Sequence, residues 1–192
     1  MSVGSHHGDN DDPAPVAVVV KLLQKNPGLR AHLARRPIVN RQYRVPYLAG
    51  SSIDGATTYI DNQTPEKFPL SGVYPDETYS WHERPEWWLG TMLGLPYFPA
   101  TGYGAHRLAH GIEQYLMKLD GIDDERIAQY EKESLALVNI DEHVKLPPEA
   151  FPPDLWLEPY IAADDADRAE DRLDQRLLPL LRQAQFVKRT AA

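Results

Sequence analysis

Three residues within the segment 81–87 have the types and the spacing of a metal-dependent active site. His82 and Glu86 are four residues apart, so a helix carries both on one face, and Glu83 lies about 100° round the helix from His82. In zinc hydrolases with a His-Glu-x-x-His helix, the residues at i and i+4 bind zinc and the intervening Glu acts on a water molecule. The segment therefore predicts two metal ligands, His82 and Glu86, with Glu83 as general base. Glu86 stands where the usual motif has a second histidine.

A second segment, 105–113, can supply the third protein ligand that a catalytic zinc site needs beside its open position. His106, His110 and Glu113 follow at i, i+4 and i+7 and so form one stripe of a helix. We expect His106 to complete the site and Glu113 to orient a ligand by accepting a hydrogen bond from it. A helix-bundle metalloprotein that uses these residues is disfavoured, because di-iron bundles carry Glu-x-x-His and His110-x-x-Glu113 runs the other way.

Structural alternatives exist for the same residues. Ser80-x-x-Glu83 has the form of a capping box, in which Glu83 would satisfy backbone donors at the start of a helix. The His and Glu residues of both segments can equally belong to solvated helix faces. These alternatives place the side chains at the surface or at a helix end, so they differ from a metal site in burial and in neighbours.

A series of short motifs resembles a group of uncharacterised bacterial and bacteriophage-associated proteins with a zincin-like His-Glu-x-x-Glu signature. In chain order the motifs are Ala49-Gly-Ser-Ser-x-Asp-Gly55, Tyr59-Ile-Asp61, His82-Glu-x-x-Glu86, Ala105-His-x-x-Ala-x-x-x-Glu113 and Asp154-Leu-x-Leu-x-Pro-Tyr160. The resemblance covers roughly residues 44–160 and implies a zincin-like metallopeptidase with Zn²⁺ as cofactor.

Carried over residue by residue, the resemblance implies that His82, Glu86 and His106 bind the metal. It also implies that Glu83 is the general base and that Glu113 is the supporting carboxylate. This ligand set is the same as the one that helical spacing predicts.

The sequence departs from the family pattern around these motifs. His110 falls at a variable position, and either Tyr97 or Tyr103 takes the place of the tyrosine that precedes the Ala-His motif. Either tyrosine can donate a hydrogen bond to an oxyanion or simply pack in an aromatic cluster. The loop 94–104 is longer than the family's link. Pro85 lies inside the metal motif, so we expect the helix to begin near its second residue or to bend there.

Helices are expected to carry both metal segments. Apolar periodicity predicts helices over residues 15–25, 29–36, 80–93, 105–119 and 123–138, with a strand over Val16–Val20 as an alternative for the first. The Asp54-Gly55 pair predicts a β-hairpin over residues 44–61, whose edge strand could hold an extended peptide. Asp54 and Asp61 are expected to serve turns.

We expect an α+β fold in which a small antiparallel, hairpin-based sheet packs on a zincin-like helix pair between irregular proline-rich flanks. Proline density predicts irregular structure over 62–76 and an extended segment without regular helix over 144–160. The expected divisions are a disordered acidic tail (1–15), a single zincin-like domain (16–163) and a charged C-terminal helical extension (164–192), which Pro179 kinks or interrupts.

Composition narrows the classes of function. The 192 residues include no cysteine, which excludes disulfides, thiolate zinc sites and thiol nucleophiles but leaves a His/Glu/His centre open. The net charge of −8 argues against nucleic acid and against an anionic membrane as partner. No signal peptide or membrane span is predicted, so we expect a cytoplasmic protein, or a virion-associated one if it is phage-encoded.

Two functions follow. The first is a zinc-dependent hydrolase, most simply a metallopeptidase with a peptide or protein substrate, in which zinc activates water and Glu83 takes its proton. The second is a non-catalytic, phage-related structural or accessory protein that binds a phage-related partner and keeps a structural or vestigial metal site. The proline-rich segment 144–160 suits partner binding as well as it suits packing on the chain's own surface.

Overall fold

The structure, a computed structural model, describes residues 14–99, 103–162 and 177–190. Its first half contains α1 (Ala14–Lys25), α2 (Pro27–Ala34), β1 (Ile38–Asn40), the 3₁₀ turn η1 (Pro46–Leu48), β2 (Ala49–Ser51) and β3 (Thr57–Ile60). Its second half contains α3 (Pro75–Trp87), the π-helical turn η2 (Trp88–Met92), α4 (Ala105–Leu119), α5 (Asp124–Leu137), α6 (Ile140–His143), the 3₁₀ turn η3 (Pro148–Ala150) and α8 (Leu177–Thr190). The α+β class is confirmed.

The sheet has three strands in the order β1-β3-β2. β2 and β3 pair antiparallel as the predicted hairpin, and Gly55 turns the chain between them with a φ of 67°, which glycine adopts without strain. β1 pairs parallel with β3, so the sheet is mixed and the prediction of an antiparallel sheet is wrong. With three residues, β1 is too short for its apolar alternation to be recognised in the sequence.

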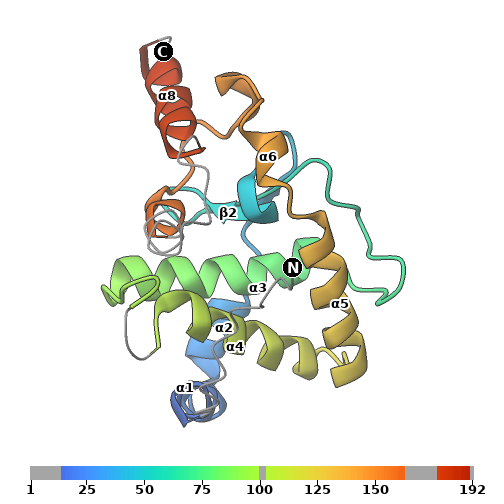
Figure 1. The fold of residues 1–192 in the computed structure, drawn as a ribbon. Coiled ribbons are helices and arrows are strands. Elements are labelled where there is room, and N and C mark those ends of the chain that lie inside the picture. Colours follow the sequence, from blue (N-terminus) through green and yellow to red (C-terminus); the bar gives the residue numbers. More distant parts are fainter. Residues whose placement is uncertain (1–13, 100–102, 163–176, 191–192) are drawn as a thin grey trace, which may run out of the picture.

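The elements are arranged in layers (Figure 1). Helices α3 and α4 lie side by side through the middle of the molecule, α1 and α2 cover one side of this pair, and the sheet, α6 and α8 lie on the other. A large apolar cluster fills the space among α1 to α5 and the adjoining part of the sheet. A second cluster packs the sheet against the C-terminal elements and contains Val45, Tyr59, Phe151, Leu155, Tyr160, Leu181 and Ala184.

A strap, residues 151–160, covers the edge of the sheet formed by β2. Ser52 pairs with Leu155 as an antiparallel bridge, and the backbone N–H of Trp156 donates to the carbonyl of Ser51 at 2.8 Å. The extended part of the predicted segment is confirmed here, but the 3₁₀ turn η3 and a helix that begins at residue 158 contradict the absence of helix over 144–160. The edge expected to hold an extended substrate is therefore occupied by the chain itself.

Asp61 joins the hairpin to the C-terminal elements. This buried carboxylate accepts hydrogen bonds from Arg44 Nε (3.0 Å), from the backbone N–H groups of Val45 (2.8 Å) and Gln63 (2.9 Å), and from His143 Nε2 (2.9 Å). Burial alone would raise its pKa, but these donors lower the pKa to about 2. The expectation that Asp61 serves the turn is confirmed, and the ion pairs extend that role to a link between distant segments.

Helix α3 begins at Pro75 and not near Ser80 as predicted. A proline in the first turn costs no hydrogen bond, and the acidic residues beside it favour the positive end of the helix dipole. Ser80 lies within the helix and donates its hydroxyl to the carbonyl of Asp76 at 2.5 Å. Glu83 is also well inside the helix, so the capping-box alternative is wrong.

Pro85 lies inside α3, which neither begins nor ends there. The expectation that the helix starts near Glu83 is therefore wrong. Because proline lacks an N–H, one α-helical hydrogen bond, to the carbonyl of Trp81, is missing. The chain leaves α3 through the π-helical turn η2, a form that often accompanies functional sites.

The remaining helices test the other predictions. α1 and α2 are confirmed and the strand alternative for Val16–Val20 is wrong, while α4 and α5 match their predicted bounds to within a residue. Pro179 lies in the first turn of α8 and does not interrupt it. The predictions for residues 1–13 and 163–176 fall outside the described residues. Within the described ranges, no helix has the length and apolar character needed to cross a bilayer.

Candidate metal centre

The two packed helices α3 and α4 bring together the three predicted metal ligands. His82 Nε2 lies 3.0 Å from Glu86 Oε2 and 3.2 Å from His106 Nδ1, and the last two atoms are 2.9 Å apart. The three atoms form a group of ligand type and spacing suited to a metal ion. The solvated-face alternative is wrong for His82 and Glu86, whose side chains are only 13% and 2% exposed.

The spacing of the three atoms fits a zinc ion. Ligand atoms around tetrahedral zinc lie about 3.3 Å from one another when the metal bonds are about 2.0–2.1 Å long. The triangle measured here has a circumscribed radius of about 1.8 Å, so a point at bonding distance from all three atoms lies roughly 1 Å off their plane. His82, Glu86 and His106 can therefore hold one metal ion after small side-chain adjustments.

Glu113 holds His82 from the side opposite the metal position. Its Oε2 lies 3.0 Å from His82 Nδ1, and its Oε1 accepts a hydrogen bond from the hydroxyl of Tyr130 at 2.8 Å. A carboxylate on Nδ1 keeps the proton there and leaves Nε2 free to bind a metal. Glu113 therefore lies where the sequence predicted a supporting carboxylate.

Replacing Glu113 with glutamine should lower zinc affinity by about 10- to 100-fold, because loss of an orienting carboxylate typically has this effect. Isothermal titration of zinc into the metal-free variant measures the change. Glu125→Gln, at an exposed acidic position in the first turn of α5, is the matched control and should bind zinc as the wild type does. Equal affinity in all three proteins would contradict the orienting role.

Glu83 is a buried carboxyl on the same helix as His82 and Glu86. It is 8% exposed, and within the described part of the chain no group donates a hydrogen bond to its side chain. Burial, followed by the charge of Glu86, raises the pKa of Glu83 to about 8. Burial and the neighbouring carboxylate therefore disfavour the charged form of Glu83. Strand β2 lies against this turn of α3, where Ser51 Oγ donates to the carbonyl of Glu83 at 3.2 Å.

The histidines and carboxylates of the centre lie next to one another, and each shifts the pKa of its neighbour. Burial disfavours a charged His82, but hydrogen bonds with Glu113 and Glu86 raise its pKa well above the usual value. Burial disfavours the charge on Glu86 too, yet His106 and His82 lower the pKa of that carboxyl to about 2. A bound dication would replace the proton on His82 Nε2, which faces Glu86, and leave the Nδ1 proton hydrogen-bonded to Glu113.

His110 belongs to the surroundings of the centre, although the family pattern set it aside. Its Nδ1 lies 3.2 Å from Glu113 Oε2 and its Nε2 3.3 Å from Glu131 Oε1. Burial opposes its charge, but these carboxylates raise the pKa of His110 to about 9. His82, His110 and Glu113 form a second group of metal-ligand type. Glu131 was missed in the sequence because it comes from α5, where nothing in its spacing marks it.

The two candidate tyrosines have different surroundings. The hydroxyl of Tyr97 lies 3.0 Å from His106 Nδ1, whereas Tyr103 packs against the core with the guanidinium of Arg107 over its ring at 4.3 Å. Burial, then the charges of nearby carboxylates, raises the pKa of Tyr97 well above its usual value, so the hydroxyl keeps its proton. Of the two, Tyr97 is the one placed to donate a hydrogen bond at the centre.

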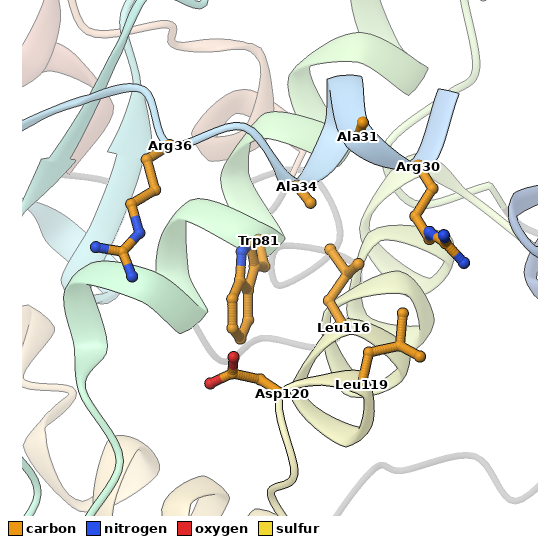
Figure 2. A pocket seen from close by; sticks show the side chains of 8 residues that line it. All are labelled: Arg30, Ala31, Ala34, Arg36, Trp81, Leu116, Leu119 and Asp120. Atoms are coloured by element: carbon orange, nitrogen blue, oxygen red, sulfur yellow. The ribbon is translucent and has the colours of Figure 1, made fainter. Parts of the chain in front are cut away.

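A pocket of about 240 Å³ lies away from the metal centre, between α2 and α4 (Figure 2). Trp81 forms its back wall, with Arg36 and Arg30 at opposite ends. Its other lining residues are Ala31, Ala34, Leu116, Leu119 and Asp120. The pocket contains none of the predicted metal ligands, so it does not give a substrate access to them.

Comparison with models of known protein families, with curated proteins and with solved structures finds no match to this chain. The likeness to zincin-like peptidases, read from short motifs, therefore stays a prediction. The function is inferred from the geometry and chemistry of the metal centre.

Proposed function

We propose that the chain is a zinc-dependent hydrolase, most simply a metallopeptidase, whose zinc is bound by His82, Glu86 and His106. The observation that supports this most strongly is the convergence of one ligand atom from each residue, 2.9–3.2 Å apart, across two packed helices. Three protein ligands with a further position left for water or substrate are typical of catalytic rather than structural zinc sites.

Each residue around the ligands has a chemical task. Zinc, when bound, supplies a Lewis acid that lowers the pKa of water and polarises a carbonyl group. Glu83 takes the proton of the attacking water, since its buried carboxyl lies on the same helix, one residue from the ligand His82. Tyr97 donates its hydroxyl proton in a hydrogen bond to the developing oxyanion. Glu113 keeps His82 in the tautomer that binds metal.

The test combines metal content with turnover. Zinc-loaded protein should hold one zinc per chain by elemental analysis and cleave fluorescein-labelled casein or a mixed quenched-peptide library. Glu83→Gln should retain the zinc and lose at least about 100-fold in rate, the usual contribution of a general base. Glu133→Gln, which alters a carboxylate bound to backbone N–H groups of the 70–71 turn, is the matched control. Absence of zinc, or full activity of Glu83→Gln, would overturn the proposal.

One observation favours the second candidate, a non-catalytic accessory protein with a structural metal site and a phage-related protein partner. The strap pairs with β2 and removes the sheet edge that could have held an extended substrate. On this alternative, zinc removal lowers the melting temperature and no peptide in the library is cleaved. Turnover therefore separates the candidates, because both hold zinc and only the hydrolase cleaves a peptide.

A further inference from the structure

The metal centre meets solvent on the side of His106. The side chain of His106 is 40% exposed, in contrast to the nearly covered side chains of Glu86 and His82. A substrate can therefore reach the ligands past the residues around His106. The chain segment next to it is the loop 94–99, which leads from η2 towards α4.

Phe98 presents an exposed aromatic ring at this opening. The residue is 47% exposed, and its ring centroid lies 5.2 Å from the ring of His106 and 4.5 Å from that of Tyr97. Both contacts are edge-to-face, with interplanar angles of 66° and 81°, so the ring packs against the centre with one part left open. The exposed part of the ring lies beside the candidate ligand His106, so an apolar group bound at His106 could pack on it.

Backbone contacts hold the loop that carries this ring. The N–H of Leu95 donates to the carbonyl of Leu89 at 3.1 Å, and the N–H of Ala105 donates to the carbonyl of Pro96 at 2.9 Å. Gly104 lies so close to the loop that a Cβ there would be 2.0 Å from the carbonyl oxygen of Tyr97. The backbone that carries the ring is thus held in place before a ligand arrives, which lowers the entropic cost of binding to it.

We infer that Phe98 forms the wall of an apolar subsite for a large aromatic or branched aliphatic side chain of the substrate, next to the group that the metal polarises. The rings of Phe98 and Tyr97 pack edge to face and form an apolar surface here, so an apolar side chain is favoured over an ionic one. The inference rests on the proposed function, because it names the substrate class of that same centre. Phe98 acts on specificity and takes no part in the bond-breaking step.

Small hydroxamates test the subsite without requiring turnover, since they bind zinc directly. By calorimetry, the zinc-loaded protein should bind 3-phenylpropionohydroxamate at least about tenfold more tightly than acetohydroxamate. The reason is that the phenyl group covers the ring of Phe98. Phe98→Ala should lose most of this difference while its affinity for acetohydroxamate stays within about twofold of the wild type. Phe98→Leu should keep part of the difference in affinity. Leu135→Ala, which alters a 73% exposed residue of α5, is the control and should keep all of it.

The outcomes separate this inference from the proposed function. If the protein binds zinc but has equal affinity for the two hydroxamates, the subsite alone is overturned. The same holds if Phe98→Ala keeps the preference for the phenyl compound. A protein that takes up no zinc when zinc is supplied overturns both the proposed hydrolase and the subsite. Loss of the preference in Phe98→Ala with unchanged zinc content supports the subsite.

Discussion

Replacing His82 with alanine should remove zinc binding, with an affinity loss of more than about 1,000-fold. His82 is the residue that joins the whole centre, because its Nε2 faces Glu86 and His106 while its Nδ1 faces Glu113. Without it, two ligands remain, fewer than any catalytic zinc site uses. The variant also leaves the buried carboxylates of Glu86 and Glu113 without their shared partner, so the melting temperature of the metal-free protein should fall as well.

Competition between the protein and a chromogenic zinc chelator measures this loss. His32→Ala is the matched control, because His32 lies exposed on α2 and belongs to no metal-ligand group among the described residues. It should bind one zinc per chain with wild-type affinity. Stoichiometric, tight zinc in His82→Ala would show that the metal is held elsewhere and would refute the assigned ligand set.

Replacing Asp61 with asparagine should lower the free energy of unfolding by about 3–5 kcal/mol, the usual effect of removing one partner from a buried ion pair. Asp61 is 1% exposed and faces both Arg44 and His143. An amide in its place cannot balance the charge of Arg44, and its NH₂ group would face donors. Urea denaturation measures the change. Asp54→Asn, at an exposed turn position with two local hydrogen bonds, is the matched control and should cost about 1 kcal/mol.

The contribution of Asp61 depends on pH with a defined sign. Its pKa falls from 3.8 to about 2 on folding, so its stabilisation is fully present above the unfolded value. It is lost as the pH falls from about 4 to about 2, where the folded protein also takes up the proton. The difference in the free energy of unfolding between the wild type and Asp61→Asn should therefore become smaller as the pH falls over this range. A gap that stays constant down to about pH 2 would contradict the charged role of Asp61.

The candidate ligands could be predicted from the sequence because helical spacing is a local property. His82 with Glu86, and His106 with Glu113, share helix faces whatever the rest of the fold does. That these faces meet depends on two adjacent helices packing together, and the structure shows this packing. Glu131 and Tyr130 could not be predicted in the same way, because their approach to Glu113 depends on how α5 lies against α4.

The wrong or missing predictions about the fold have similar causes. The start of α3 at Pro75 was missed because apolar periodicity begins only near Trp81, although Pro75-Asp-Glu has the composition of a helix start. Strand β1 has three residues and pairs with a strand 17 or more positions further on, so no local signal marks it. The extended part of the strap was predicted from its prolines. Its pairing with β2 was not, because composition does not show which distant segment a strand pairs with.

The pairing of Ser52 with Leu155 also has a kinetic consequence. Contacts between residues so distant in the chain form late in folding, because a long loop must close before they can stabilise anything. His82 and His106 lie much closer together and leave the ribosome earlier, on two helices that pack directly on each other. The candidate ligands can therefore come together while the sheet edge is still open, and the strap closes the edge at β2 afterwards.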